Sequence, residues 1–203
     1  MSIESWLISL AFWLGADVLG SIPSGLLLTR LLHGVDVRTH GSGNIGSANV
    51  YRTAGVLAGA LTLVFDTLKG LLPVLAAGAI DLPLWAVLAT GAAAVVGHNW
   101  SIFLRGKGGK GIATSLGVLF GIAPVVAGVA LLIWVVVVMA SRYASLASLL
   151  MIGSVPVTLA VFDYHHLYLI FGTLLVALAI YRHRVNIMQL INGTELKISD
   201  RSR

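Results

Sequence analysis

The chain has 203 residues, of which 58% are hydrophobic and 10% are charged, and it carries a formal net charge of +5 and no cysteine. Soluble domains contain roughly 25% charged residues, so this composition excludes a soluble globular protein and indicates an integral membrane protein. The absence of cysteine excludes disulfides, a thiolate nucleophile and cysteine-bound metal. We expect an all-α integral membrane protein that forms a single domain over residues 1–203, without a cofactor or a metal ion.

Long apolar runs alternate with short polar interruptions along the chain. Because a helix needs about 20 apolar residues to cross the hydrocarbon core, we divide the chain at these interruptions. The first run lacks a basic n-region and an obvious small-residue cleavage site, so it is predicted to be a retained span and not a signal peptide. The predicted segments are residues 6–32, 51–80, 84–104, 112–140, 146–162 and 167–181.

The charge distribution predicts which loops face the cytoplasm. Cytoplasmic loops of membrane proteins carry an excess of Lys and Arg, and here one set of loops is basic whereas the other holds only Glu4, Asp81 and Asp163. Short basic clusters between apolar runs are typical of juxtamembrane residues and anion sites, so the positive charge does not predict a nucleic-acid partner. The basic set consists of Arg30, Arg38, Arg52, Arg105, Lys107, Lys110, Arg142, Arg182, Arg184, Lys197, Arg201 and Arg203.

The basic loops place the N-terminus outside and the C-terminus in the cytoplasm, which requires an odd number of crossings. If residues 112–140 formed one crossing, the loop at 106–111 and Arg142 would lie on opposite faces of the membrane. We therefore divide this run near Pro124 into two short or tilted helices. The resulting prediction is seven transmembrane helices.

The first polar cluster, HGSGNIGSANVYR at residues 40–52, is rich in glycine and amide side chains. Glycines let consecutive backbone N–H groups converge on an anion, and a helix that begins near Ser47 adds its positive N-terminal end. Arg52 adds a planar fork suited to phosphate. The pattern predicts a phosphate site, although a flexible loop that joins two membrane helices is equally compatible with this stretch alone. The candidate residues are Gly41, Ser42, Gly43, Asn44, Asn49 and Arg52.

The second cluster, FLRGKGGKGIATS at residues 103–115, alternates glycine with three cations directly ahead of an apolar helix. This arrangement again brings N–H groups and positive charge together at a helix start. A positive-inside loop would explain the cations but not the glycines, so we favour an anion site. On its own, a histidine at the end of the preceding helix is more typical of an interface than of a site. The candidate residues are His98, Lys107, Gly108, Gly109, Lys110 and Thr114.

The third cluster is RHRVNIMQLINGTE at residues 182–195. If the last helix continues through it, His183 and Asn186 share a face and either bind phosphate, orient a hydroxyl or form a solvated helix end. Asp66 and Lys69 are also three residues apart but within a span, where an unpaired charge is expensive, so we expect them to pair as structural support. The candidate residues are His183, Asn186 and Glu195, together with Ser145, which carries little weight alone because serine in membrane helices is usually packing.

Taken together and in this order, GSGNIGSANVYR, GHNWSIFLRGKGGKGIATSLG and HRVNIMQLINGTE resemble the three motifs of the bacterial acyl-phosphate-dependent glycerol-3-phosphate acyltransferases, the PlsY family. The resemblance covers nearly the whole chain and includes a DxxKG pattern at residues 66–70. The departures are small: Ser47 and Ala48 stand where Ala-Thr is expected, and Val185 stands where the family often has Glu. The second departure leaves Glu195 as the carboxylate of this motif.

The resemblance implies transfer of a fatty acyl group from acyl phosphate to the 1-hydroxyl of sn-glycerol 3-phosphate, giving lysophosphatidate and phosphate. It also implies a fold of seven helices in the bacterial cytoplasmic membrane, with the site facing the cytoplasm and membrane lipid around it. Acyl phosphate has a good leaving group, so positioning and charge stabilisation suffice and no acyl-enzyme is expected. The catalytic set carried over from the family is Ser42, Arg52, Lys110, His183 and Asn186, with His98, Lys107 and Ser145 at the same pocket.

Two other classes of protein also place cations or glycines between membrane helices: a transporter and a scaffold without chemistry. A transporter for a phosphorylated solute also needs cations among membrane helices, but it predicts polar groups at the membrane midplane and on both faces. Here the polar clusters are assigned to one face. A membrane scaffold without chemistry does not explain three clusters that combine glycine with cations.

Overall fold

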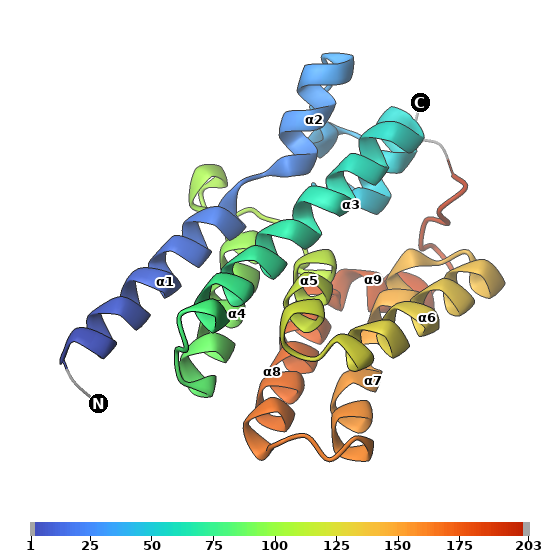
Figure 1. The fold of residues 1–203 in the computed structure, drawn as a ribbon. Helices are drawn as coiled ribbons and strands as arrows, with labels where there is room; N and C mark the ends of the chain where they lie inside the picture. Colours follow the sequence, from blue (N-terminus) through green and yellow to red (C-terminus); the bar gives the residue numbers. More distant parts are fainter. Residues whose placement is uncertain (1–2, 201–203) are drawn as a thin grey trace.

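The structure, a computed structural model, describes residues 3–200, and its regular secondary structure is helical throughout that range. Figure 1 shows the long helices packed side by side, with α1 starting at the lower left and the last described residues at the upper right. The helices are α1 (Ile3–Ser21), α2 (Ser24–His33), η1 (Val37–Thr39), α3 (Ser47–Ala79), α4 (Leu84–Asn99), η2 (Ile102–Leu104), α5 (Ile112–Ile122), α6 (Pro124–Ser141), α7 (Ala144–Val161), α8 (His166–Arg182) and α9 (Arg184–Ile191).

Five helical stretches in the described chain are long and apolar enough to cross a membrane, and six are if α8 and α9, bent by 63°, count as one span. The predicted all-α integral membrane class is confirmed. Helix α5 has 11 residues and is therefore about 16 Å long, shorter than the ~30 Å hydrocarbon core. The count of seven crossings and the orientation of the termini stay predictions. The predicted single domain over residues 1–203 extends beyond the described residues. The basic residues Arg201 and Arg203 lie outside them.

Helix breaks fall partly where the sequence predicts them. The predicted division of the run 112–140 is confirmed, because α5 ends at Ile122 and α6 begins at Pro124. The segment 6–32 is also interrupted, between Ser21 and Ser24, since proline removes an N–H donor and disfavours helix in the residue before it. The segment predicted to start at residue 51 begins at Ser47 and contains a sharp break at Gly55.

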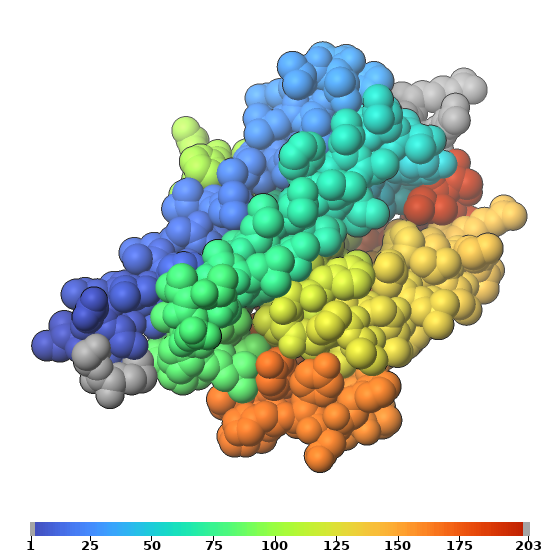
Figure 2. All heavy atoms as spheres, viewed as in Figure 1, coloured from blue at the N-terminus to red at the C-terminus, as the bar shows by residue number. Residues whose placement is uncertain are grey.

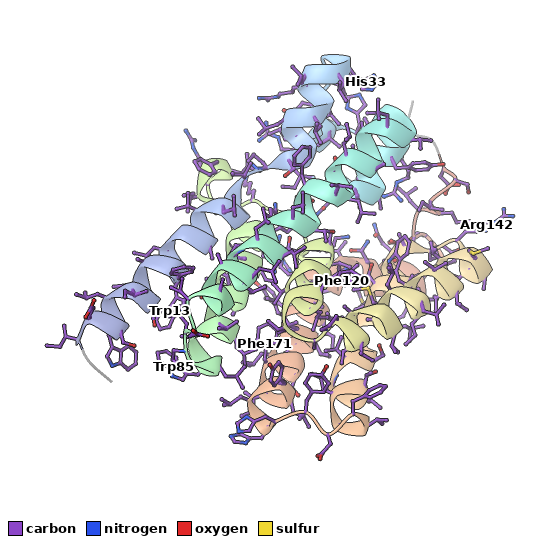
Figure 3. All side chains as sticks on the ribbon, viewed as in Figure 1. Trp13, His33, Trp85, Phe120, Arg142 and Phe171 are labelled. Atoms are coloured by element: carbon purple, nitrogen blue, oxygen red, sulfur yellow. The ribbon has the colours of Figure 1, made fainter. Side chains whose placement is uncertain are left out.

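Helices α1 and α4 pack with their backbones in close approach. A Cβ atom on Gly20 would lie against the backbone of Ala94, and one on Gly97 would lie against the backbone of Asp17. The other end of the pair is held by aromatic rings: Figure 3 shows Trp13 and Trp85 together, edge to face with 5.8 Å between ring centroids. Small residues drive helix association in membranes because lipid removes the hydrophobic advantage of larger side chains.

Helices α3 and α5 pack in the same way. A Cβ atom on Gly70 would meet the carbonyl of Thr114, and one on Gly117 would meet the carbonyl of Thr67. In Figure 2, α3 runs across the near face of the molecule, over α4 and beside α5 and α6. This packing fixes the start of α5 relative to α3.

The predicted pairing of Asp66 with Lys69 is confirmed. Lys69 Nζ lies 2.8 Å from Asp66 Oδ1, and both side chains are almost fully buried. Lys69 Nζ also donates a hydrogen bond of 3.0 Å to the carbonyl of Ile22, at the point where α1 ends. The carbonyl of Ile22 also accepts from the N–H of Ser24 at 3.0 Å, so the ammonium adds a second hydrogen bond at the break between α1 and α2.

We predict that Gly20→Ala lowers the free energy of unfolding by about 1–3 kcal/mol, because the added methyl group forces α1 away from α4. The measurement is the thermal unfolding midpoint in detergent. Gly15→Ala is the matched control, since a Cβ atom on Gly15 in the same helix meets nothing within 4 Å. Equal midpoints for the two variants would contradict this account of the helix contact.

Candidate active site

A cavity of about 430 Å³ draws its lining from all three predicted polar clusters, together with α3, α5, α6 and α7. One part of the lining is polar and the other is apolar. The polar part is formed by Ser42, Asn44, Gly46, Ser47, Asn49, Arg52, Asp66, Thr67, His98, Lys110, Gly111, Ser145, Ser148, His183, Asn186 and Glu195. The apolar residues include Leu63, Val64, Leu68, Ile112, Leu116, Phe120, Leu131, Trp134 and Met151.

Helices α3, α5 and α7 begin at this cavity. Their N-cap residues are Gly46, Gly111 and Tyr143, and within residues 3–200 no side chain caps any of the three. The first turn of a helix leaves N–H groups without intrahelical partners and carries a partial positive charge. Three helix starts at one cavity are an arrangement that suits an anion.

Asn49 fixes the loop of the first cluster. Its Nδ2 donates to the carbonyls of Val37, His40 and Asn44 at 2.9–3.1 Å, while its Oδ1 accepts from the N–H of Ser42 at 2.9 Å. The side-chain amide is thus committed to the loop, although Asn49 lines the cavity. In the structure Asn49 holds Ser42 and its neighbours in place, and its contact with substrate stays a prediction.

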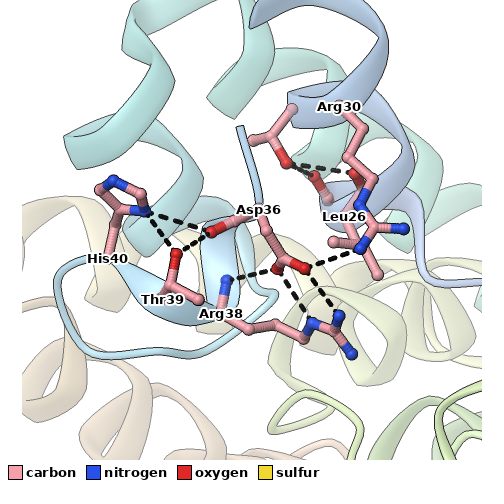
Figure 4. A network of polar contacts seen from close by, with 8 residues as sticks. Leu26, Arg30, Asp36, Arg38, Thr39 and His40 are labelled. Carbon is pink, nitrogen blue, oxygen red and sulfur yellow. Dashed lines mark hydrogen bonds and ion pairs between the residues drawn. The ribbon is translucent and has the colours of Figure 1, made fainter. Parts of the chain in front are cut away.

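The segment that leads into this loop is held by Asp36. Its carboxylate accepts hydrogen bonds from the guanidinium of Arg38 at 2.6 and 2.9 Å and from that of Arg30 at 2.7 Å (Figure 4). These bonds, from Arg38 above all, hold the pKa of the Asp36 carboxyl well below its usual range. The network joins the end of α2 to η1 and so fixes where the glycine loop begins.

Arg182 clamps the glycines of the second cluster. Its guanidinium donates to the carbonyls of Gly108 and Gly109 at 2.6–3.1 Å and lies 5.3 Å from the ring centroid of Trp100. The glycine loop is also held by α4, because the N–H of Gly109 donates to the carbonyl of His98 at 2.9 Å. A Cβ atom on Gly108 or Gly109 would meet the backbone or ring of His98, so only glycine fits.

Several candidate residues lie outside the cavity lining. Gly41 and Gly43 have φ of 55° and 67° and form the exposed turn, Lys107 is exposed, and Thr114 is buried where α5 meets α3. Gly108 and Gly109 position the loop rather than line the cavity. The structure therefore does not bring these six residues to the cavity: Gly41, Gly43, Lys107, Gly108, Gly109 and Thr114.

A chain of hydrogen bonds orders the cations and amides of the cavity. Lys110 Nζ donates to Asn186 Oδ1 at 2.6 Å, and Asn186 Nδ2 donates to both carboxylate oxygens of Glu195 at 2.9 and 3.0 Å. Burial lowers the pKa of Lys110 to about 8; Glu195 opposes this shift, and the charges of Arg52 and Arg182 add to it. In Figure 2 part of the red C-terminal region is visible between the start of α3 and the end of α6.

Six side chains within residues 3–200 bury polar atoms that have no hydrogen-bond partner, and Arg52 and Ser145 are two of them. Arg52 is 8% exposed and its Nε has no hydrogen-bond partner, and the same holds for the hydroxyl of Ser145, which is 5% exposed. A buried polar group without a partner costs about 1–3 kcal/mol. Both residues line the cavity, so a ligand with several acceptor oxygens would satisfy them.

His183 has a defined tautomer. Its Nδ1 lies 2.9 Å from the carbonyl of Ala179 and, because a carbonyl only accepts, Nδ1 must carry the proton. The Nε2 of a neutral His183 is therefore a hydrogen-bond acceptor. This nitrogen suits a hydroxyl group better than a phosphate oxygen, which also only accepts.

The sequence predicts a hydrophobic slot beside the anion site, but it does not identify the apolar residues that line the cavity or the clamp by Arg182. Trp134 of α6 donates to the hydroxyl of Ser148 at 3.3 Å and so fixes one wall. Apolar residues that face a cavity and those that face lipid follow the same helical pattern, so no signal in the sequence separates them. Arg182 was distinguishable only as one of many basic residues.

Three comparisons with known proteins bear on this site. A family model described as glycerol-3-phosphate acyltransferase matches residues 10–193. A glycerol-3-phosphate acyltransferase of Geotalea daltonii is 49% identical over 182 residues, which are 90% of this chain and 93% of that protein. One of Desulforudis audaxviator is 46% identical over 184 residues, with 91% and 92% covered.

Two solved structures share the fold. Both are crystal structures of PlsY (YgiH), an integral membrane glycerol 3-phosphate acyltransferase, in a glycerol 3-phosphate form and a lysophosphatidic acid form. Their TM-scores against this structure are 0.89 and 0.87, each at 40% sequence identity, with 93% of this chain and 94% of the other chain covered.

We predict that the affinity for inorganic phosphate falls as the pH rises through about 8, because Lys110 then loses its charge. With its pKa lowered to about 8, the Lys110 side chain is mostly charged below this pH and mostly neutral above it. Loss of one charge-assisted hydrogen bond corresponds to a decrease of roughly tenfold or more. The measurement is equilibrium phosphate binding between pH 6.5 and 9.5, as an approximate range around that pKa.

Lys110→Arg is the matched control, since arginine stays charged over this range. The variant should lose the decrease near pH 8. If wild type and Lys110→Arg have the same pH dependence, Lys110 does not hold the anion.

Proposed function

The chain belongs to the glycerol-3-phosphate acyltransferase family, and on this premise we propose that it transfers a fatty acyl group from acyl phosphate to the 1-hydroxyl of sn-glycerol 3-phosphate. The products are lysophosphatidate and inorganic phosphate. The observation that carries the proposal is a cavity whose polar half gathers helix N-termini with Arg52 and Lys110 and whose other half is apolar. Both substrates carry phosphate, and one of them also carries a fatty chain.

The polar half of the cavity binds phosphate and the apolar half binds the acyl chain. Arg52, Lys110 and the hydroxyl of Ser145 hold phosphate oxygens together with the amides at the starts of α3, α5 and α7. The apolar residues of α3, α5, α6 and α7 take the acyl chain. The carbonyl carbon of the acyl phosphate then lies at the boundary between the halves, where the glycerol hydroxyl can reach it.

The reaction needs no covalent intermediate. The 1-hydroxyl oxygen attacks the carbonyl carbon, a new C–O ester bond forms, and the bond from that carbon to the phosphate oxygen breaks. The phosphate leaves with the electron pair, and the cations that hold it stabilise its charge. Holding both substrates in one cavity converts a reaction between two molecules into an oriented one, which by itself lowers the barrier by several kcal/mol, roughly 7–11 at best.

Two groups are candidates to accept the hydroxyl proton: the phosphate of glycerol 3-phosphate and the Nε2 of His183. We propose that the phosphate dianion of glycerol 3-phosphate takes it, since the second pKa of a phosphate monoester is near 6. His183 then orients the hydroxyl through Nε2, the nitrogen that its bond to the carbonyl of Ala179 leaves as an acceptor.

We also propose that seven helices cross the bacterial cytoplasmic membrane, with α5 as a short crossing and the cavity open to the cytoplasm. In Figure 1 the chain reverses direction between α5 and α6 and again between α6 and α7. The turns between α3 and α4 and between α7 and α8, which hold Asp81 and Asp163, lie at one end, whereas the turn at Arg142 lies at the other. This separation of charge supports a cytoplasmic C-terminus and an outer N-terminus.

We predict that the purified protein forms lysophosphatidate from palmitoyl phosphate and glycerol 3-phosphate, detected by mass spectrometry of the lipid products. Palmitoyl-CoA in place of palmitoyl phosphate should give no product, because the proposed reaction releases phosphate as the leaving group and a thioester has none at its carbonyl carbon. Product from palmitoyl-CoA alone would refute the proposed donor.

We predict that Arg52→Ala raises the KM for at least one phosphate-bearing substrate roughly tenfold or more, because a charge-assisted hydrogen bond to phosphate is lost. The measurement is steady-state kinetics with each substrate varied in turn. Arg184→Ala is the control, since Arg184 is exposed and lies against the ring of Tyr181 outside the cavity lining. An unchanged KM for both substrates in Arg52→Ala would remove Arg52 from the site.

A further inference from the structure

Helix α3 does not run straight from Ser47 to Ala79. Gly55 has φ of 83° and ψ of −173°, a backbone conformation that is essentially restricted to glycine. The break separates residues 47–54, here called the site turn, from the long helix over residues 56–79. Both parts contribute to the cavity: Asn49 and Arg52 from the site turn, and residues such as Leu63 and Asp66 from the long helix.

The site turn folds back on the long helix. In a straight helix, residues eight apart are separated by about 12 Å along the axis. Here a Cβ atom built on Gly59 would lie only 2.8 Å from Cβ of Tyr51 and 2.9 Å from its Cα. Gly55 therefore turns the chain, and Gly59 provides the space into which Tyr51 packs.

The fold-back places Arg52. If residues 47–54 continued the long helix, they would extend it by about 12 Å along its axis, and Tyr51 could not lie against Gly59. With the break, Arg52 is buried and lines the same cavity as Lys110 and Glu195. The start of α3 at Gly46 also opens onto that cavity.

We propose that Gly55 is a positioning residue for the acyl transfer: its break holds the guanidinium of Arg52, and the N-terminus of α3, at the phosphate end of the cavity. This inference rests on the proposed function for its substrates. The geometry of the break itself does not depend on that function.

The test compares two glycines of α3. A Cβ atom on Gly55 or on Gly78 meets nothing within 4 Å, so neither alanine clashes, and only Gly55 has a positive φ. Gly55→Ala should raise the KM for the phosphate substrate that Arg52 holds roughly tenfold or more. Gly78→Ala, the matched control, should stay within about twofold of wild type. Thermal unfolding is recorded for both variants.

A second variant and a double-mutant cycle separate positioning from a general loss of structure. Gly59→Ala keeps a helical backbone but pushes against Tyr51, and it should raise the same KM. If the Gly55→Ala variant cannot be purified, the KM of Gly59→Ala tests the proposal in its place. In an Arg52→Ala background, Gly55→Ala should raise the KM by a smaller factor than it does in the wild-type protein, because the part of its effect that acts through Arg52 is already lost.

The proposal is overturned if the KM in Gly55→Ala matches that in Gly78→Ala, or if the effects of Gly55→Ala and Arg52→Ala multiply as independent sites do. Equilibrium binding of inorganic phosphate is measured on the same variants. Because that binding needs no turnover, it tests the inference even if the wild-type protein transfers no acyl group, and the two failures remain distinguishable.

Discussion

The unpaired amides at the starts of α3, α5 and α7 are the interaction on which the rest of the site depends. Two of these helices have glycine at the N-cap, where serine or aspartate would bond to the amides and close them to a ligand. Glycine leaves the N–H groups open, and burial beside the membrane strengthens their field. An arrangement of this kind suits phosphate, and Arg52 and Lys110 add the charge that backbone alone does not provide.

The geometry of such a site depends on side chains that hold its loops and its cations in place. Asn49 holds the first loop, Arg182 holds the second, and Glu195 orients Asn186 toward Lys110. Each support forms its hydrogen bonds within the protein; Asn49 is buried, whereas Arg182 and Glu195 are partly exposed. The break at Gly55 is the backbone counterpart of these side chains, since it brings Arg52 to the cavity.

The sequence predicts the polar half of the site because polar residues interrupt long apolar runs and stand out against them. Ser42, Arg52, Lys110, His183 and Asn186 all line the cavity, and the pairing of Asp66 with Lys69 follows from their spacing. The break at Gly55 could not be predicted, because glycine in a membrane helix usually serves packing, as Gly70 and Gly117 do. Whether the short α5 crosses the membrane is likewise undecided by its pattern alone, since 11 apolar residues suit a short span as well as a buried helix.

The central claim is that one cavity holds both phosphates at the same time. Its most direct test is the binding of glycerol 3-phosphate to protein saturated with an unreactive alkyl phosphonate analogue of acyl phosphate, measured by calorimetry. The account predicts that glycerol 3-phosphate still binds, with an affinity within about tenfold of that for the free protein. Mutual exclusion of the two ligands would contradict it, because the reaction would then require an acyl group carried by the protein.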